Sequence, residues 1–354
     1  MQRMLSLATL AGLGAAVWMF LSGGGLNQLA VPPAGVGQPA TPGAGFGSPA
    51  TWNGGAVTPT VQPTAAGIGA PALGASPTFR IASFNIEVFG KTKSEDARVM
   101  YTLAEIVRNF SIVAIQEIRT QDDSHLANFV RLVNSSGKSP RRYEYVIGPR
   151  LGNSQSKEQY AFIFDTQRVM IDPNTVFTVG DPNNLLHREP LVASFRTTEA
   201  ADSAFTFTLV NVHTDPGPEP NVLPGELAAL AEVYREVRRT GRGEDDIIML
   251  GDFNADDAYI SKQTRIGMIP GVTPLVRGVY SNTRQNKLYD NLIVHALSTT
   301  EYAGKSGVFN FGQAYNLSPA EAEQVSDHFP VWAEFSVYEL DYNGVIARRG
   351  TNVR

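Results

Sequence analysis

Short apolar runs that end in polar side chains organise most of this chain. Ile247–Leu250 consists of four apolar residues, too few for a helix and typical of a buried strand. Gly251 ends the run, and Asp252, Asn254 and Asp256 follow it. Sites in α/β sheets form at the carboxyl ends of strands. The run therefore predicts either a polar turn, or a loop whose oxygens hold a hard cation or the water and phosphate beside one.

Periodicity predicts two strand–helix–strand units in this part of the chain. The first unit comprises residues 79–85, 94–110 and 112–115, and the second comprises residues 205–212, 223–239 and 247–250. Polar side chains stand at the ends of all four strands: Asn85 and Glu117 in the first unit, His213 and Asp252 in the second. We therefore expect two similar halves that meet around one site.

Further strands follow from the same pattern. They are predicted at residues 143–147, 160–164, 175–179, 191–195, 292–294 and 330–337. Strands are thus abundant and helices few, which predicts an α/β fold with two stacked sheets and helices outside them. The last residues, 341–354, mix Gly, Asn and Arg and predict a flexible tail.

The first 77 residues differ from the rest of the chain. Residues 4–21 carry no charge and follow Arg3, which is typical of an export signal or a short membrane anchor; a buried or disordered N-terminus is the alternative. Residues 22–77 also lack charged side chains and are rich in Gly, Ala, Pro and Thr, which predicts a disordered linker. We therefore expect residues 1–21 to place the domain at residues 78–340 outside the cytoplasm, either secreted, periplasmic or anchored to a membrane.

Composition excludes several kinds of site. The chain has no cysteine, so disulfides, zinc–thiolate centres and thiol nucleophiles are absent. It also contains no serine-nucleophile motif and no Gly-rich phosphate loop. Its net charge of −5 argues against tight, purely electrostatic binding of nucleic acid. An enzyme that touches a polyanion through a local basic rim and metal ions remains compatible with this charge.

Two of the five histidines stand beside acidic residues at the expected strand ends. His213 ends a predicted strand, and His328 follows Asp327 just before the last one. Glu158 and Asp290 lie next to strand starts, from which they could orient the two imidazoles. Histidines with carboxylate partners are suited to moving protons near pH 7. The alternative for each histidine alone is a satisfied polar residue.

The other three histidines favour structural roles. His125 follows two aspartates and a serine at a predicted helix start, which favours a surface or capping role. His187 lies in a loop and His295 ends a strand. Among the acids, Glu117, Asp252 and Asp327 are placed as cation ligands or their supports would be, although each alone could be a surface carboxylate. Clustered carboxylates repel one another unless a metal or a protonated histidine lies among them.

Eight short strings in this region occur in the order and with the spacing of one enzyme family. On these strings the region resembles the endonuclease/exonuclease/phosphatase superfamily, and within it the deoxyribonuclease I branch. The strings are Ser83–Ile86, Ile115–Arg119, Lys157–Tyr160, Arg188–Pro190, Asn211–His213, Gly251–Asp256, Tyr289–Asp290 and Ser326–Pro330.

The resemblance implies a four-layer α/β/β/α sandwich and metal-dependent cleavage of phosphate esters, with Mg²⁺ as the cofactor and Mn²⁺ able to replace it. It implies that Glu117 is the main Mg²⁺ ligand and that Asn85 and Asp327 lie close to the metals. Asp252 and Asn254 would position the attacking water, or the scissile phosphate and a second metal.

The same resemblance implies two proton-handling pairs, one activating water and the other protonating the leaving oxygen. The pairs are Glu158 with His213 and Asp290 with His328. Which pair is the acid and which the base stays open. Arg188 would contact phosphate, and Arg119 would reach into the minor groove of DNA. We expect both imidazoles and Glu117 to face one pocket.

His213 and the string Lys157–Tyr160 favour the deoxyribonuclease I branch, because apurinic-site endonucleases of the superfamily usually carry tyrosine where His213 stands. Several departures limit the resemblance, and two of them concern the substrate and calcium. Ser156 replaces a tyrosine that packs on the sugar in the minor groove, and Val279 replaces an aspartate of a calcium loop. Preference for duplex DNA and dependence on Ca²⁺ are therefore not implied.

Three functions of different classes follow from these observations. The first is an exported, Mg²⁺-dependent, non-specific endodeoxyribonuclease with DNA as substrate. The second keeps the chemistry but acts on a phospholipid head group or a small phosphodiester, with residues 4–21 placing the enzyme at a membrane. The third is a non-catalytic binding module that kept the fold.

Overall fold

The computed structural model describes residues 77–135, 142–152, 157–215, 225–241 and 243–347. The predicted signal or anchor, nearly all of the predicted linker, and the end of the predicted tail lie outside these ranges. Within them, no helix is long and apolar enough to cross a membrane. All described helices and strands belong to one compact unit.

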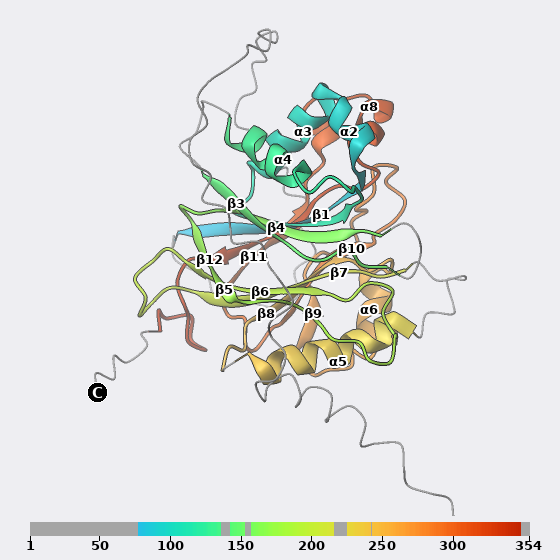
Figure 1. The fold of residues 1–354 in the computed structure, drawn as a ribbon. Helices are drawn as coiled ribbons and strands as arrows, with labels where there is room; N and C mark the ends of the chain where they lie inside the picture. Colours follow the sequence, from blue (N-terminus) through green and yellow to red (C-terminus); the bar gives the residue numbers. More distant parts are fainter. Residues whose placement is uncertain (1–76, 136–141, 153–156, 216–224, 242, 348–354) are drawn as a thin grey trace, which may run out of the picture. The chain divides into compact units, whose positions relative to one another are not determined.

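Two six-stranded sheets form the centre of this unit (Figure 1). The first sheet has the order β11 (Tyr302–Val308), β12 (Val331–Ser336), β1 (Thr78–Phe89), β2 (Ile112–Ile118), β4 (Gln159–Asp165) and β3 (Tyr143–Ile147). The second has the order β5 (Val169–Thr178), β6 (Leu191–Thr197), β7 (Thr206–His213), β8 (Ile247–Asp252), β10 (Asp290–His295) and β9 (Val272–Pro274). β1–β2 and β7–β8 are parallel pairs, and the other pairs are antiparallel.

Helices cover the outer face of each sheet. Apolar side chains of α3 (Ala97–Val107), α4 (His125–Asn134), α7 (Phe311–Ala314) and α8 (Pro319–Val325) pack on the first sheet, and α2 (Lys91–Glu95) precedes α3. α5 (Gly225–Thr240) and α6 (Asp257–Gln263) pack on the second sheet. The predicted four-layer α/β/β/α sandwich is therefore confirmed.

Both faces of the central strands are buried, and alternate side chains enter different cores. In β8, Ile248 and Leu250 enter the core between the sheets, whereas Ile247 and Met249 pack against the helices. Successive side chains of a strand point to opposite faces. A strand covered on both sides therefore reads as a continuous apolar run, which is why residues 247–250 could be recognised.

Several element predictions need correction. The predicted helix at 94–110 is two helices, α2 and α3, because the Asp96 side chain caps a new helix by accepting from the backbone N–H groups of Arg98 and Val99. The strand predicted at 175–179 is the end of the longer strand β5. The sequence patterns predicted only the start of α4, and they did not predict α6, α7, α8, β9 and β11. α8 begins with a capping box between Ser318 and Glu321, a sequence pattern that indicates the start of a helix.

The surface or capping role predicted for His125 is wrong. The side chain is buried and its ring packs edge-on against Phe89, with centroids 4.3 Å apart. Its Nδ1 lies 2.9 Å from the hydroxyl of Ser94, and the N-cap position of α4 belongs to Ser124. The preceding aspartates indicated a helix start correctly, but the contact with Phe89 lies far away in sequence and left no local signal.

Candidate active site

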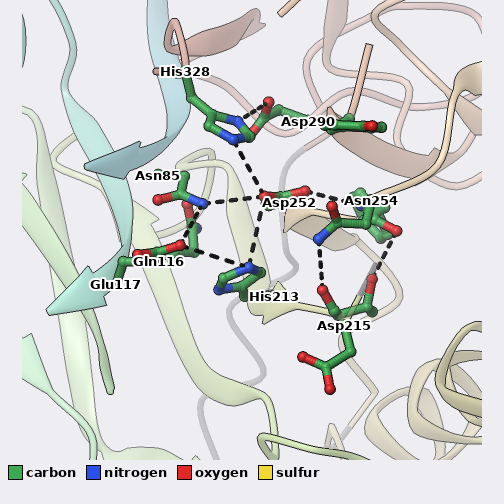
Figure 2. Close-up of polar contacts among 12 residues, drawn as sticks. Asn85, Gln116, Glu117, His213, Asp215, Asp252, Asn254, Asp290 and His328 are labelled. Carbon is green, nitrogen blue, oxygen red and sulfur yellow. Dashed lines mark hydrogen bonds and ion pairs between the residues drawn. The ribbon is translucent and has the colours of Figure 1, made fainter. Parts of the chain in front are cut away.

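Strand register places the predicted polar residues side by side. In the second sheet, His213 of β7 is the register partner of Asp252 of β8, which is in turn the partner of Asp290 of β10. In the first sheet, Asn85 lies in β1 and Glu117 in the neighbouring strand β2. Since the two sheets stack, these strand ends face a common centre, as Figure 2 shows.

Two histidine–carboxylate pairs face this centre. His213 Nδ1 lies 2.8 Å from Glu158 Oε1, and His328 Nδ1 lies 2.8 Å from Asp290 Oδ2. Each Nε2 atom lies 3.7 Å from the same oxygen, Asp252 Oδ2, so the two cannot be further apart than twice that distance. The carboxylates hold Nδ1 on the far side of each ring and leave Nε2 directed at the centre, where it can exchange a proton.

The oxygen-rich corner beside His213 fits a hard divalent cation. Glu117 Oε1 lies 4.0 Å from His213 Nε2, and Asn85 Nδ2 donates to both Asp252 Oδ2 (3.1 Å) and Glu117 Oε1 (3.4 Å). Ligand atoms of Glu117, Glu158 and His213 all lie within 4.8 Å of one another. Carboxylate oxygens are ligands that Mg²⁺ and Ca²⁺ prefer. Asn85 directs its amide N–H groups at these carboxylates, and its Oδ1 accepts from the backbone N–H of Glu87.

Electrostatics favour protonated imidazoles in the metal-free site. Burial lowers the pKa of His328, but the carboxylates of Asp290 and Asp252 outweigh it and raise that pKa well above its usual value. Burial also lowers the pKa of His213, but the hydrogen bond to Glu158 outweighs it, so the net pKa of His213 is raised. Burial also raises the pKa of Asp252. Burial would raise the pKa of Glu158 too, but the hydrogen bond with His213 outweighs it and the net pKa is lowered.

These shifts predict the titration of His328 in the metal-free protein. We expect NMR of the imidazole nitrogens to show His328 still protonated above pH 6.5, and Asp290→Asn to lower its pKa, because the nearest negative charge is gone. A raised pKa adds stability that is complete below about pH 6.5 and is lost as the pH rises through the folded value. His125, whose pKa is lowered by burial, is the internal control and should titrate alike in both proteins. An unchanged pKa of His328 in the variant would contradict the pairing.

Local backbone strain positions two of the site residues. Glu117 has φ of +63° and Asn254 has φ of +47°, a region that costs residues other than glycine roughly 1–3 kcal/mol. Glu117 is held there by the backbone N–H of Val88, which donates to Oε2 at 2.9 Å. Gly251 has φ of +152°, and a Cβ on it would lie 1.9 Å from the carbonyl oxygen of Val212. Only glycine therefore lets β8 approach β7 directly before Asp252.

A buried polar network under the site joins the two sheets. Gln116 of the first sheet donates to Asn211 Oδ1 of the second at 2.6 Å and to the hydroxyl of Ser83 at 3.0 Å. Asn211 in turn donates to the backbone carbonyls of Ile115 and Ala161. Buried amides are stabilising when each group has a partner, so this network ties the floor of the site to both halves. Sequence reasoning did not foresee it.

Two serines that sequence reasoning missed hold the second pair. Ser281 donates to Asp290 Oδ2 at 2.6 Å, the same oxygen that faces His328. Ser326 donates to the carbonyl of Asn85 at 2.8 Å and accepts from the backbone N–H of His328 at 3.0 Å. Ser326 lies two residues before His328, a spacing that is typical of a serine turn and could have been predicted from the sequence. Ser281 had none.

The predicted arginines lie behind and beside the pairs. Arg188 is buried, with Nε 3.1 Å from Glu158 Oε1, a separation typical of an ion pair but without hydrogen-bond alignment. Arg119 Nη2 lies 3.2 Å from Glu117 Oε2 and 3.4 Å from Glu158 Oε2. Both guanidinium groups thus offset the charge of Glu158. Their contacts with phosphate and with the minor groove stay predictions.

The remaining predicted residues lie at the edge of the centre. Asp327 is half-exposed, and its Oδ1 is 3.8 Å from His328 Nε2. Asn254 donates its side-chain N–H to the carbonyl of Thr214 at 2.7 Å and its backbone N–H to Asp252 Oδ1 at 2.9 Å. His187 Nδ1 lies 2.8 Å from Asp215 Oδ2, and His295 Nδ1 accepts from Ser298, consistent with structural roles for both.

A family model, curated relatives and a solved structure all show similarity to the same enzyme family. Residues 82–286 match the Endonuclease/Exonuclease/phosphatase family. Deoxyribonuclease gamma of Rattus norvegicus is 33% identical over 267 residues, which cover 72% of this chain and 83% of the rat protein. Deoxyribonuclease-1 of Bos taurus is 30% identical over 266 residues, covering 72% of this chain and 91% of the bovine protein. Among solved structures, an endonuclease/exonuclease/phosphatase family protein from Bacteroides thetaiotaomicron matches with a TM-score of 0.50 and 16% identity, covering 73% and 97% of the two chains, which supports the fold alone.

Proposed function

Because the chain belongs to the endonuclease/exonuclease/phosphatase family, and is a hydrolase of phosphodiester bonds, we propose that it is a non-specific endodeoxyribonuclease that uses Mg²⁺. The observation that carries the proposal is the pair of imidazoles that share Asp252 opposite Glu117. Two relatives with 30–33% identity over most of their length are named deoxyribonucleases, which favours DNA as the substrate.

Hydrolysis of a phosphodiester needs two proton transfers and a counter-charge. The attacking water must lose a proton, and the expelled alkoxide must gain one, so two separate proton carriers are required. His213, oriented by Glu158, and His328, oriented by Asp290, supply one carrier on each side of Asp252. The geometry is compatible with either assignment of acid and base.

The cation site lies next to the proton carriers. Glu117 would hold Mg²⁺ with Asn85 and Asp327 close by, and the ion would neutralise the negative charge that develops on the phosphate. Asp252 and Asn254 would position the water or the scissile phosphate. Asp252 serves this purpose without moving, because Asn85 and the backbone N–H of Asn254 each donate to one of its oxygens.

DNA would approach through the arginines at the margin of the site. Arg119 is a quarter exposed and stands between Glu117 and Glu158, so a phosphate or a base edge could exchange with one of its carboxylate partners. Arg188 is buried at the back of the Glu158–His213 pair, and its contact with phosphate needs a shift of its ion pair. Ser156, the position of the missing tyrosine, lies outside the described residues.

A substrate panel tests the proposal. We expect the full chain to nick supercoiled plasmid DNA with Mg²⁺ or Mn²⁺ and to stop on addition of EDTA, because the acidic corner cannot stabilise a phosphate without a cation. The panel also contains single-stranded DNA, RNA, bis-p-nitrophenyl phosphate and sphingomyelin vesicles, with a Glu117→Gln preparation as the control for contaminating nucleases. Cleavage of the vesicles without nicking would move the assignment to a phospholipid diesterase. DNA binding without turnover would instead identify a binding module.

A further inference from the structure

A second group of carboxylates lies at the opposite end of β8 from the candidate active site. Asp246 stands directly before β8, whereas Asp252 ends that strand. Glu301 stands directly before β11, and Glu339 follows β12. One oxygen from each of these three residues lies within 4.8 Å of the others. This cluster (Asp246, Glu301 and Glu339) has no part in the proposed hydrolysis.

The backbone holds these carboxylates together. The N–H of Leu340 donates to Glu301 Oε1 at 2.6 Å, and the N–H of Thr206 donates to Glu339 Oε2 at 3.2 Å. Neither carboxylate can therefore swing into solvent without breaking a bond to the chain. Asp246 and Glu301 are moreover almost fully buried, at 2% and 0% exposure. The cluster is thus a fixed feature of the fold.

Three buried oxygens in this cluster lack a partner. They are Asp246 Oδ1, Glu301 Oε2 and the hydroxyl of Thr299, whose side chain is 2% exposed. Thr299 lies close to Asp246 and partly offsets the rise that burial causes in the pKa of Asp246. Its hydroxyl nevertheless forms no hydrogen bond of good geometry with Asp246 Oδ1. Buried polar atoms nearly always have a partner, so three in one place indicate a partner that these side chains do not show, either a bound ion or a shared proton.

The charge around the cluster is negative. Among the described residues, neither Asp246 nor Glu301 forms an ion pair with lysine or arginine, and Glu244 and Asp245 stand just before Asp246 in the chain. The nearby Arg238 reaches the hydroxyl of Ser298 instead. Burial and the adjacent carboxylate of Glu339 raise the pKa of Glu301 to about 8. A bound cation or a retained proton would reduce the repulsion among these carboxylates.

We propose that Asp246, Glu301 and Glu339, together with the Thr299 hydroxyl, form a structural binding site for a divalent cation of the calcium class. The donors are all oxygen, which such cations require. Oxygens bound to one Ca²⁺ at 2.3–2.6 Å lie at most about 5 Å apart, which agrees with the separations found here. Mg²⁺ is the weaker fit, since it keeps several waters and this cluster is buried. The ion would link the starts of β8 and β11 to the segment after β12.

Thermal unfolding of the full chain with Ca²⁺ tests the site separately from catalysis. Ca²⁺ at a hundred times its dissociation constant should raise Tm by roughly 5–10 °C. With saturating Mg²⁺ present to fill the active site, we expect Glu301→Gln and Glu339→Gln each to lose this shift, and isothermal titration with Ca²⁺ to lose one site. Glu117→Gln is the matched control: it removes a carboxylate from the active site and should keep the shift. Nicking by Glu339→Gln with Mg²⁺ should stay within about twofold of the wild type, because Glu339 does not touch the active site.

Each alternative result overturns the proposal. A wild-type Tm that is insensitive to Ca²⁺ but rises as the pH falls would mean that the cluster holds a shared proton. A full shift in Glu339→Gln would place the ion elsewhere, and loss of the shift only in Glu117→Gln would place it in the active site. If the buried change Glu301→Gln prevents folding, Glu339→Gln, which is partly exposed, decides alone.

Discussion

His213→Ala and His328→Ala are each expected to lower the rate of DNA nicking by about 10²–10⁴-fold, because each change removes one of the two proton carriers that flank Asp252. The two rings are held by different carboxylates, Glu158 and Asp290, so neither can take the place of the other. Nicking of supercoiled plasmid under saturating Mg²⁺ measures the loss.

The matched control for these variants is His295→Ala. His295 ends β10, the strand that begins with Asp290, so it stands at the other end of that strand, and its Nδ1 accepts from Ser298. This variant should keep near wild-type nicking. A double variant His213→Ala/His328→Ala should lose little beyond either single change, since the residues act as a unit. Near wild-type activity of either single variant would refute a mechanism with two proton carriers.

Glu117→Gln is expected to lower nicking at 5 mM Mg²⁺ by about 10²-fold or more, because it removes a charged ligand from the oxygen-rich corner that fits the cation. The amide keeps an oxygen for the backbone N–H of Val88, which now donates to Glu117 Oε2, so the local fold should survive. Titration of Mg²⁺ in the nicking assay, with thermal unfolding in parallel, separates lost binding from lost folding.

The expected signature of Glu117→Gln is a shift of the Mg²⁺ titration to higher concentration, by at least about tenfold. Glu232→Gln is the matched control, since Glu232 is an exposed acid of α5 that pairs only with Arg235 in the described part of the chain. An unchanged Mg²⁺ titration in Glu117→Gln would show that the cation binds elsewhere. Reduced activity with an unchanged titration and a lower Tm would indicate damage to the fold instead.

Local sequence patterns predicted the buried strands well because their signal is local. The strand at 143–147 agrees with β3 at both ends, and the run 247–250 lies within β8. Elements stabilised by distant contacts were harder to recognise. β11 contains two glycines and exposed residues, and it is a strand only because it pairs with β12. Tertiary pairing, and not intrinsic propensity, made it a strand.

The predicted site residues lie around one centre. The family resemblance named the partners of the two imidazoles, but no local pattern of the sequence indicates them. Glu158 and His213 are separated by 55 positions, and Asp290 and His328 by 38. That both imidazoles share one oxygen of Asp252 depends on the register of β7, β8 and β10. Ser281 lies in the segment between β9 and β10 and donates to Asp290 nine positions later, a contact that no short string indicated.

By itself, the sequence determined that buried strands would end in amide, carboxylate and imidazole side chains, since the period of a strand and the types of its residues are local properties. Only the tertiary structure decided that both imidazoles share one oxygen of Asp252, that His125 is buried, and that Asp246, Glu301 and Glu339 converge at the other end of β8. The reason is physical: these contacts join segments far apart in the chain, and their geometry is set by strand register and sheet packing.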